Sequence, residues 1–490
     1  MSPLTERPNS LLRSPVAWLR SGRGRLATID TARAAPPPSP LAPIDLQDPA
    51  QVAGVMQIAA RIGDILLSSG TGNRDASAQI HAVTTAYGLH YCHVAITMNT
   101  ITIATSIGTT TKTPVDVFRV SRQMTTDFSK LAEVDRLIRS IQSGATPPAL
   151  AESILDELEA RPKDYGFKTA MWGWALLGGS ATVLLGGNLA VAAITFVTSL
   201  FIMVTAELLS RRGLPPFFQQ MVGGFIATVP AAVLYQLVNT LGFSFRPSQI
   251  IASCIIVLVS GLSLVQSLQD GMTGAAVTGS ARFFDTLLMT VGIVAGVAIG
   301  IRTSTFLGIS LPPFEVSNPP NFASGVIRTI ASAFVCAGFA IGSFAERAAV
   351  RVSAISGIVG AAVVYLVLIP MGIGEVAASG VSAVVIGFAG GLLSRRFLIP
   401  PLITGLSGVT PLLPGLLLYR AMYALLNSQM VVGFTNLFLA LSIGGALAAG
   451  LVFGEWSARR VRRPQVFRPY DAFRRAGRFS FQKRPRPRRS

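Results

Sequence analysis

The sequence predicts a polytopic α-helical membrane protein with ten transmembrane helices in two related halves, preceded by a small α/β cytoplasmic domain. Three observations predict this fold class. Half of the 490 residues are hydrophobic and only 13% are charged, whereas about a quarter of a soluble chain is charged. The formal net charge is nevertheless +18. Apolar stretches long enough to cross a bilayer recur from about residue 170 onward.

The basic excess lies at the two ends of the chain. Residues 1–33 hold six Arg and two acids, and residues 456–490 hold thirteen Lys or Arg and one Asp. Residues 169–455 hold eleven Arg, no Lys and seven acids, which is too little charge for a water-exposed surface. We therefore expect residues 1–49 to be a disordered basic arm and Pro-rich linker, and residues 456–490 to be a basic cytoplasmic tail.

Such an excess often indicates a nucleic-acid partner. Residues 34–168, however, carry eleven basic and thirteen acidic residues, so the domain that would bind nucleic acid has no net positive charge. We expect no nucleic-acid partner, and we expect the two basic tails to contact anionic lipid of the inner leaflet. The N-terminal arm has only short apolar patches such as Val16–Leu19, too short for a secretory signal.

Residues 50–168 have the mixed patterning of a compact α/β domain. Segments with apolar residues at helical spacing lie on both sides of a segment in which every second residue is apolar. That middle segment predicts a strand pair with a turn at Asn99–Thr100. Helices are predicted at Val52–Ser69, Asp75–Tyr87, Phe128–Gln142 and Pro148–Ala160, and strands within Tyr91–Thr105 and at Val115–Val120.

The three histidines of the chain, His81, His90 and His93, all lie in this domain. On a strand His90 and His93 point to opposite faces, which favours ordinary packing over a metal site. The three cysteines are widely spaced and form no metal motif. Gly70–Gly72 lacks the other residues of a phosphate-binding loop, and no nucleophile elbow is present. We therefore predict no enzyme activity, no metal and no cofactor.

Ten spans follow this domain, in a first membrane half at 169–302 and a second at 324–455. We predict the spans at residues 170–187, 189–209, 217–239, 249–268, 283–301, 325–343, 350–369, 376–394, 399–423 and 430–454. Arginines follow spans two, six, eight and ten, which places these ends in the cytoplasm. Both termini are then cytoplasmic, while Arg246, Arg302 and Arg328 fall on the outer side.

An internal repeat links the two halves. Leu208–Gln236 aligns without gaps with Leu392–Arg420, and eleven of the 29 positions are identical, including Ser-Arg-Arg, two prolines and a tyrosine. This match predicts a duplication that relates spans two and three to spans eight and nine in the same orientation. Both copies predict an interrupted helix, at Pro230 in span three and at Pro411 and Pro414 in span nine, although a packed kink would also explain the prolines.

Several motifs resemble those of the bacterial threonine/serine exporter family in its single-chain actinobacterial form. They include ILLSSGTGNRDASAQI (65–80), VGGFIAT (222–228), LVQSLQDGMTG (264–274), RRFLIPPLI (395–403) and TPLLPG (410–415). The resemblance runs from about residue 34 to residue 470. It implies a secondary transporter of the bacterial plasma membrane that exports L-threonine and L-serine, driven by the proton motive force.

The substrate and protons would then need polar groups within or beside the spans. A zwitterionic hydroxy amino acid needs donors for its carboxylate and acceptors for its ammonium group, which interrupted helices can provide. The candidates around the two interruptions are Thr228, Pro230, Gln236, Thr410, Pro411, Pro414, Gly415, Arg420 and Asn436.

No acid lies at the centre of a predicted span, so position alone reveals no proton-coupling carboxylate. We favour Asp270 and Asp285, which flank a Gly-, Ser- and Thr-rich segment that would fold back as a re-entrant loop. Arg282 would pair with either acid or bind a substrate carboxylate through two hydrogen bonds. The alternative is a cytoplasmic loop with a local ion pair.

Two other functions remain open at this point. One is export of other small metabolites such as dicarboxylates. The other is a membrane enzyme that acts through its soluble domain. Nothing in the sequence specifies an oligomeric state.

Overall fold

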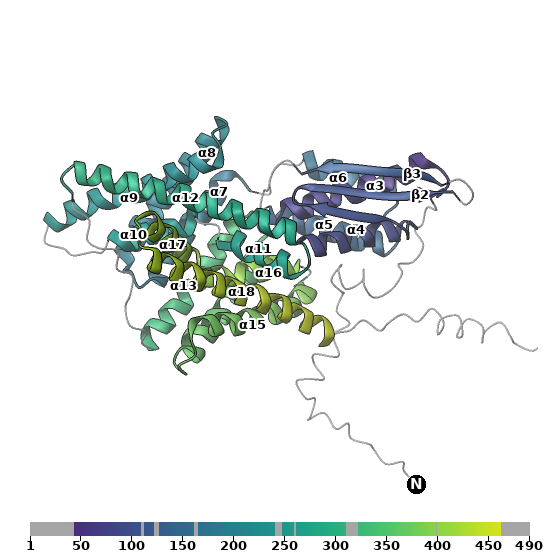
Figure 1. Cartoon of the computed structure of the whole chain (residues 1–490). Helices are drawn as coiled ribbons and strands as arrows, with labels where there is room; N and C mark the ends of the chain where they lie inside the picture. Colours follow the sequence, from purple (N-terminus) through teal and green to yellow (C-terminus); the bar gives the residue numbers. More distant parts are fainter. Residues whose placement is uncertain are drawn as a thin grey trace, which may run out of the picture.

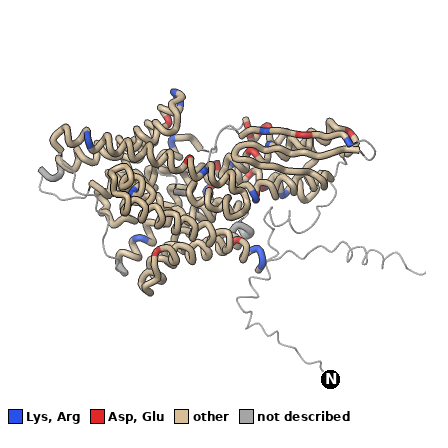
Figure 2. Tube along the Cα trace, viewed as in Figure 1, with Lys and Arg blue, Asp and Glu red and all other residues tan. Residues whose placement is uncertain are grey.

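The computed structural model describes residues 44–108, 112–121, 127–160, 165–240, 247–258, 261–309, 322–397 and 399–461. It is mostly helical, with one small sheet formed by residues 93–120 (Figure 1), and this confirms a polytopic, largely helical chain. Most of both predicted basic tails lies outside the described residues. Charged residues gather in the sheet-containing part and at helix ends, and the remaining helices have few of them (Figure 2).

The sheet-containing part, here called the α/β unit, spans residues 49–160. Its elements are α3 (Pro49–Ser68), α4 (Asn73–Ala86), β1 (His93–Thr97), β2 (Thr100–Ile107), β3 (Thr113–Val120), α5 (Phe128–Gln142) and α6 (Pro148–Ala160). The strands form an antiparallel sheet in the order β1-β2-β3. Helices α3 and α4 pack on the sheet, and α5 and α6 pack on those helices.

Local sequence explains where these elements begin and turn. Asp48 caps α3 by accepting a hydrogen bond from the backbone N–H of Ala50, with Pro49 in the first turn. Asp127 caps α5 through the N–H groups of Ser129 and Lys130. Ile101 and Ile103 alternate with polar residues on β2 and are fully buried, as the period of two requires.

The remaining helices form the part here called the helical part. They are α7 (Phe167–Leu184), α8 (Leu189–Arg211), α9 (Pro216–Thr240), α10 (Pro247–Leu258), α11 (Gly261–Met272), α12 (Ala276–Phe306), α13 (Phe322–Gly342), α14 (Arg347–Ala362), α15 (Glu375–Phe397), α16 (Pro401–Val409), α17 (Gly415–Leu426) and α18 (Met430–Val461). A π-helical turn, Val363–Leu368, continues α14. A 3-10 turn, Thr410–Leu412, follows α16.

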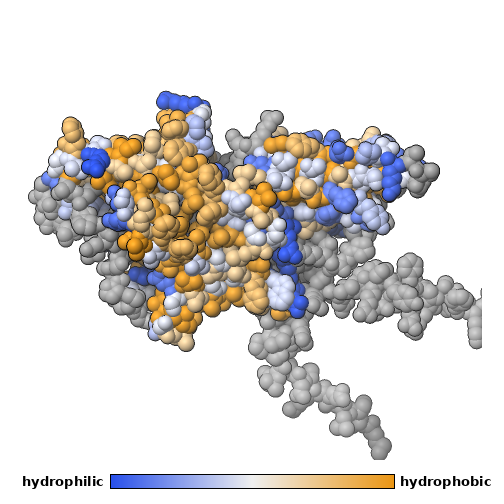
Figure 3. Space-filling view, in the orientation of Figure 1, coloured by the Kyte–Doolittle hydropathy of each residue, from blue (hydrophilic) through white to orange (hydrophobic). Residues whose placement is uncertain are grey.

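Within the described residues, eight helices are long and apolar enough to cross a membrane, or up to ten if each bent pair is one span. One of the eight is α3, which packs against the sheet of the α/β unit. The exposed side chains of the helical part are largely apolar over the visible face (Figure 3). Hydrophilic side chains gather where the helical part meets the α/β unit.

The interrupted helices differ from those that the sequence predicts. α9 continues through Pro230 without a break, so the predicted interruption of span three is wrong. The predicted interruption of span nine is present, because α16 and α17 meet at an angle of 51°. A second bend of 44° joins α10 to α11, in span four.

Packing within the helical part recurs five spans apart. α9 packs along α12 as α15 packs along α18, and α10 contacts α7, α8 and α9 as α16 contacts α13, α14 and α15. α11 contacts both α12 and α18, and α17 contacts both α18 and α12. This correspondence matches the bent pair α10/α11 with the bent pair α16/α17. The sequence repeat instead matches α9 with α16/α17, so the two correspondences differ.

The segment from residue 269 to residue 285 is not a re-entrant loop. α11 continues to Met272, α12 begins at Ala276, and a short turn with Gly274 at φ +101° joins them. Glycine tolerates this left-handed backbone without strain. The turn therefore sets the ends of α11 and α12 side by side.

Candidate functional site at the junction of the α/β unit and the helices

The corner between α3 and α4 approaches the helical part very closely. Gly70 has φ +90°, and its carbonyl accepts a hydrogen bond of 3.2 Å from Nε2 of Gln266 on α11. A Cβ atom at Gly70 would lie 2.9 Å from that Nε2 atom, and one at Gly72 would lie 3.2 Å from Oδ1 of Asp270. The glycines of this corner thus permit direct contact between backbone and α11.

Asp270 and Arg282 form a buried ion pair beneath this corner. Oδ2 of Asp270 lies 2.7 Å from Nη1 of Arg282, and the two residues are 1% and 6% exposed. Oδ1 of Asp270 accepts a hydrogen bond of 3.2 Å from the backbone N–H of Asn73, the first residue of α4. Of the two acids that the sequence offers, Arg282 therefore pairs with Asp270.

Thr278 joins the same cluster from the first turn of α12. Its hydroxyl oxygen accepts hydrogen bonds from Nδ2 of Asn73 at 2.7 Å and from the backbone N–H of Met98 at 3.0 Å. Met98 has φ +52° at the corner between β1 and β2. The hairpin corner and the α3–α4 corner therefore both dock on α12.

Four buried polar atoms of this cluster have no hydrogen-bond partner among the described residues. They are Nε and Nη2 of Arg282, Oδ1 of Asn73 and Oγ1 of Thr71. Nε and Nη2 form one edge of the guanidinium plane, the edge that binds a carboxylate through two parallel hydrogen bonds. A buried donor without a partner is destabilising, so this edge is suited to hold an anionic group.

Sequence reasoning identified Asp270 and Arg282 but missed Asn73, Thr278 and Gln266. Asn73 and Thr278 lie 205 residues apart, and no pattern in one sequence relates such distant positions. The available signal was that Asn73 and Gln266 fall inside the motifs quoted above for the family resemblance.

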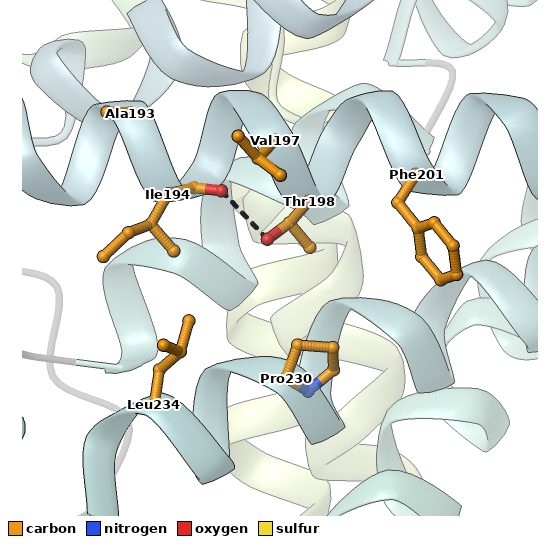
Figure 4. A pocket seen from close by; sticks show the side chains of 7 residues that line it. All are labelled: Ala193, Ile194, Val197, Thr198, Phe201, Pro230 and Leu234. Carbon is orange, nitrogen blue, oxygen red and sulfur yellow. Dashed lines mark hydrogen bonds between the residues drawn. The ribbon is translucent and has the colours of Figure 1, made fainter. Parts of the chain in front are cut away.

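Asp285 and the candidates of α9 lie apart from this cluster. Asp285 is exposed. Thr228 is fully buried and donates to the carbonyl of Gly224 in its own helix, and Gln236 is exposed. Pro230 lines an apolar groove of about 460 Å³ between α8 and α9 (Figure 4). The hydroxyl of Thr198, which also lines the groove, donates to the carbonyl of Ile194 in its own helix.

The candidates of span nine surround the bend between α16 and α17. Thr410 donates to the carbonyl of Leu406, Pro411 lies in the 3-10 turn, and Pro414 immediately precedes Gly415 at the start of α17. Arg420 is half-buried on α17, one helical turn and a half beyond the bend.

Hydroxyl groups are buried beside this bend, where α16 packs on α14. The hydroxyl of Ser356 donates to the carbonyl of Thr404 at 3.3 Å. The hydroxyl groups of Ser353 and Ser407 are buried without a partner among the described residues. Asn436 lies on α18, where it donates to the carbonyl of Val432 in its own helix.

Further contacts join the α/β unit to the other helices. The N–H of Phe128 donates to the carbonyl of Ser343 at 2.9 Å. Arg136 pairs with Glu346 at the start of α14, and Asp75 lies 3.9 Å from Arg459 at the end of α18. The α/β unit therefore contacts helices of both predicted membrane halves.

Over the described ranges, no group of three or more His, Cys, Asp and Glu side chains could hold a metal ion. Burial and the nearby His93 lower the pKa of His81 below its ordinary value. His90 is exposed and His93 lies on β1.

Comparison with known proteins gives consistent results along the chain. Two family models, both described as threonine/serine exporters, match residues 57–304 and 328–456. A threonine/serine exporter of Corynebacterium glutamicum is 57% identical over 460 residues, 94% of each chain. A "Probable threonine/serine exporter" of Mycobacterium tuberculosis is 36% identical over 83% of this chain and 77% of its own.

A weaker likeness is to a "Probable succinate transporter subunit" of Escherichia coli, 32% identical over 110 residues. That match covers 22% of this chain and 42% of the subunit. No solved structure matches the chain.

Proposed function

We propose, from the premise that this chain belongs to the threonine/serine exporter family, that it exports L-threonine and L-serine from the cytoplasm by proton antiport. The chain is a transporter and not an enzyme. The observation that carries the substrate assignment is the 57% identity to an exporter of these amino acids along 94% of both chains. Export of dicarboxylates is the second candidate, favoured by the likeness to a succinate transporter subunit over 110 residues.

The proposed topology has ten spans with both termini in the cytoplasm. Each bent pair counts as one span, and α3 belongs to a cytoplasmic α/β domain at residues 50–168. α7 is not among the helices counted above as long and apolar enough to cross a membrane, but it packs along α8 and α13, and for that reason we take it as the first span. Arg211 and Arg212 at the end of α8, Arg347 at the start of α14 and Arg459 in the last turn of α18 support this orientation by the positive-inside rule.

The two membrane halves, residues 169–302 and 324–455, are proposed to have opposite orientations. Packing that recurs five spans apart supports this, because an odd number of spans starts the second half on the other side of the membrane. Secondary transporters built from such inverted repeats bind substrate near the midplane, where their interrupted helices meet. The bends α10/α11 and α16/α17 supply two such helices.

The bend of span nine is the proposed midplane site. Pro411 and Pro414 lack backbone N–H groups, so the carbonyls of Ser407 and Thr410 have no donor four residues on. Each accepts instead from the backbone N–H three residues on, and the second lone pair of each oxygen can accept from an ammonium group. The partnerless hydroxyl groups of Ser353 and Ser407 lie on the two helices that pack there. Arg420 adds a positive charge for the carboxylate.

Asp270 is the acid that we propose for proton coupling, in preference to Asp285. Asp270 is buried and faces Arg282 and Asn73, so its protonation would alter contacts between the helices and the α/β unit. Asp285 is exposed, and its protonation would change no such contact.

Purified protein in lipid vesicles tests the function. Labelled threonine is expected to move only when a proton gradient is imposed. Equilibration at the same rate without a gradient would contradict antiport. Excess succinate is expected to leave threonine movement unchanged, whereas strong competition would favour the dicarboxylate function.

A further inference from the structure

We propose that the free edge of Arg282, formed by Nε and Nη2, binds the carboxylate of the amino acid as it leaves the cytoplasm and enters the helices. This site is separate from the bend of span nine. The inference rests on the proposed function for the identity of its ligand.

The chemistry of the guanidinium carries the first step. Nη1 of Arg282 is occupied by Asp270, but Nε and Nη2 are buried and lack partners in the described part of the chain. These two nitrogens point in parallel from one edge, which matches the two oxygens of a carboxylate. A carboxylate is also the group shared by the substrates named for the relatives: threonine, serine and succinate.

A comparison within the same molecule shows that this arrangement is unusual. Arg139 of α5 also pairs with an acid, Asp135, and also has two buried nitrogens without partners. Those nitrogens are Nε and Nη1, which lie on different edges of the guanidinium. Arg139 therefore presents no complete edge to a carboxylate, whereas Arg282 does.

Acceptors for the ammonium group lie in the same cluster. Oδ1 of Asn73 is buried and has no partner among the residues that the structure describes, and the N–H of Asn73 donates to Asp270, which binds Arg282. The carboxylate of Asp270 thus joins Arg282, which has unused donors, to Asn73, which has an unused acceptor. Thr71, between the two glycines of the corner, also has a buried hydroxyl group without a partner among the described residues.

Location explains how such a site would act. The cluster lies where the α/β unit covers the ends of α11 and α12, and the polar atoms concerned are closed off from solvent. A ligand reaches them only when the contacts of Thr278 with Asn73 and Met98 open. Substrate can therefore bind Arg282 only when the α/β unit has partly undocked from α12.

Binding of L-threonine to the full-length purified protein tests the site. The probes are L-threonine and L-threoninol, an analogue in which an alcohol replaces the carboxylate. Wild-type protein is expected to bind threoninol about tenfold to a hundredfold more weakly than threonine, the range for losing hydrogen bonds to a charged group. This arm needs no substitution and so does not depend on the folding of a variant.

The matched variants are Arg282→Lys and Arg139→Lys. Lysine keeps the positive charge beside the acid but cannot present the two-donor edge. Arg282→Lys is expected to bind threonine more weakly than wild type does, with the remaining binding due to Arg420 at the bend of span nine, and to bind threoninol no more weakly than wild type does. Arg139→Lys is expected to keep wild-type affinity for both probes.

Two results would overturn the site while leaving the exporter intact. One is wild-type protein that transports threonine yet binds threoninol equally well. The other is Arg282→Lys protein with unchanged affinity for threonine. A wild-type protein that neither binds nor transports threonine would overturn the proposed function and this site together.

Discussion

The backbone N–H of Asn73 lies 3.2 Å from Oδ1 of Asp270, so the first residue of α4 is hydrogen-bonded to an acid in the last turn of α11. Because Asp270 is also paired with Arg282, a single carboxylate links the α/β unit to both α11 and α12.

Asp270→Asn removes the charge that balances buried Arg282. Breaking a buried ion pair by neutralising one partner costs about 3–5 kcal/mol, because the other charge stays buried. We expect a clearly lower thermal unfolding temperature for the purified protein. Asp285→Asn, at an exposed position, is the control, and its stability should change by less than about 0.5 kcal/mol. Equal stability of the two variants would contradict the burial of the pair.

Cysteines at positions 73 and 278 should lock the α/β unit to α12. The side chains of Asn73 and Thr278 are in contact through a hydrogen bond of 2.7 Å, and the native cysteines are buried and free. A short thiol cross-linker is expected to join Asn73→Cys to Thr278→Cys and to stop threonine export until it is cleaved. Either single variant should be insensitive to the reagent. Full export by the cross-linked protein would show that the junction need not open.

Gly70→Ala should destabilise the protein, whereas Gly54→Ala should stabilise it. Gly70 has φ +90°, which costs a residue with a side chain about 1–2 kcal/mol, and its Cβ would press on Gln266. Gly54 lies inside α3 with no atom within 4 Å of an added Cβ, so alanine there gains about 0.5–1 kcal/mol of helix propensity. Thermal unfolding of both variants measures the two stability changes, which should have opposite signs. The same sign for both would contradict the described corner.

Pro414→Ala should reduce threonine export severalfold. Alanine restores an N–H group and allows the helix to continue across the bend between α16 and α17. Pro230→Ala is the matched control, because α9 is already continuous there and Pro230 faces an apolar groove. The export rates of the two variants are compared in vesicles, normalised to the amount of inserted protein, and only Pro414→Ala should be slower than wild type. An equal loss in both variants would argue against a special role for span nine.

His81 should make the α/β unit less stable in mild acid. Burial and repulsion from His93 lower the pKa of His81 below 6.5, so the unfolded chain takes up its proton at a higher pH than the folded chain does. Stability is therefore lost as the pH falls through about 6.5. His81→Gln should flatten this dependence between pH 7.5 and pH 5.5, as followed by hydrogen exchange of the α/β unit. An unchanged slope would contradict the shift.

Sequence patterns predicted most helices of the chain because each follows from its own residues. The apolar run of span two, for example, predicts 189–209, and α8 covers Leu189–Arg211. Strand alternation likewise located β2, because Ile101 and Ile103 are buried on every second residue. Hydrophobic length and period are local properties, so one sequence is sufficient to reveal them.

The two prolines of the sequence repeat show where local patterns fail. Pro230 and Pro414 occupy equivalent positions of the aligned segments, yet only the second lies at a break. Span nine has a further proline, Pro411, three residues earlier, so two backbone donors are missing within one turn. A single proline leaves enough hydrogen bonds for the helix to continue.

The candidate site could be predicted only in part. Arg282 and Asp270 lie twelve residues apart and can be related through the turn between their helices. Asn73 and Met98 reach the same cluster from 205 and 180 residues away from Thr278. Such contacts depend on how the α/β unit docks, which is a property of the whole fold.

The docking of the α/β unit at two separate places on the helical part limits how those places can move against each other. Asn73 holds the end of α11 and the start of α12, while Phe128 holds the carbonyl of Ser343 just beyond α13. Both residues belong to the α/β unit, so the spacing between their two partners is fixed while this unit keeps its fold and both contacts persist. Any tilt of α11 and α12 against the end of α13 must first release the α/β unit from at least one of these partners, and we expect that release to set a threshold for transport.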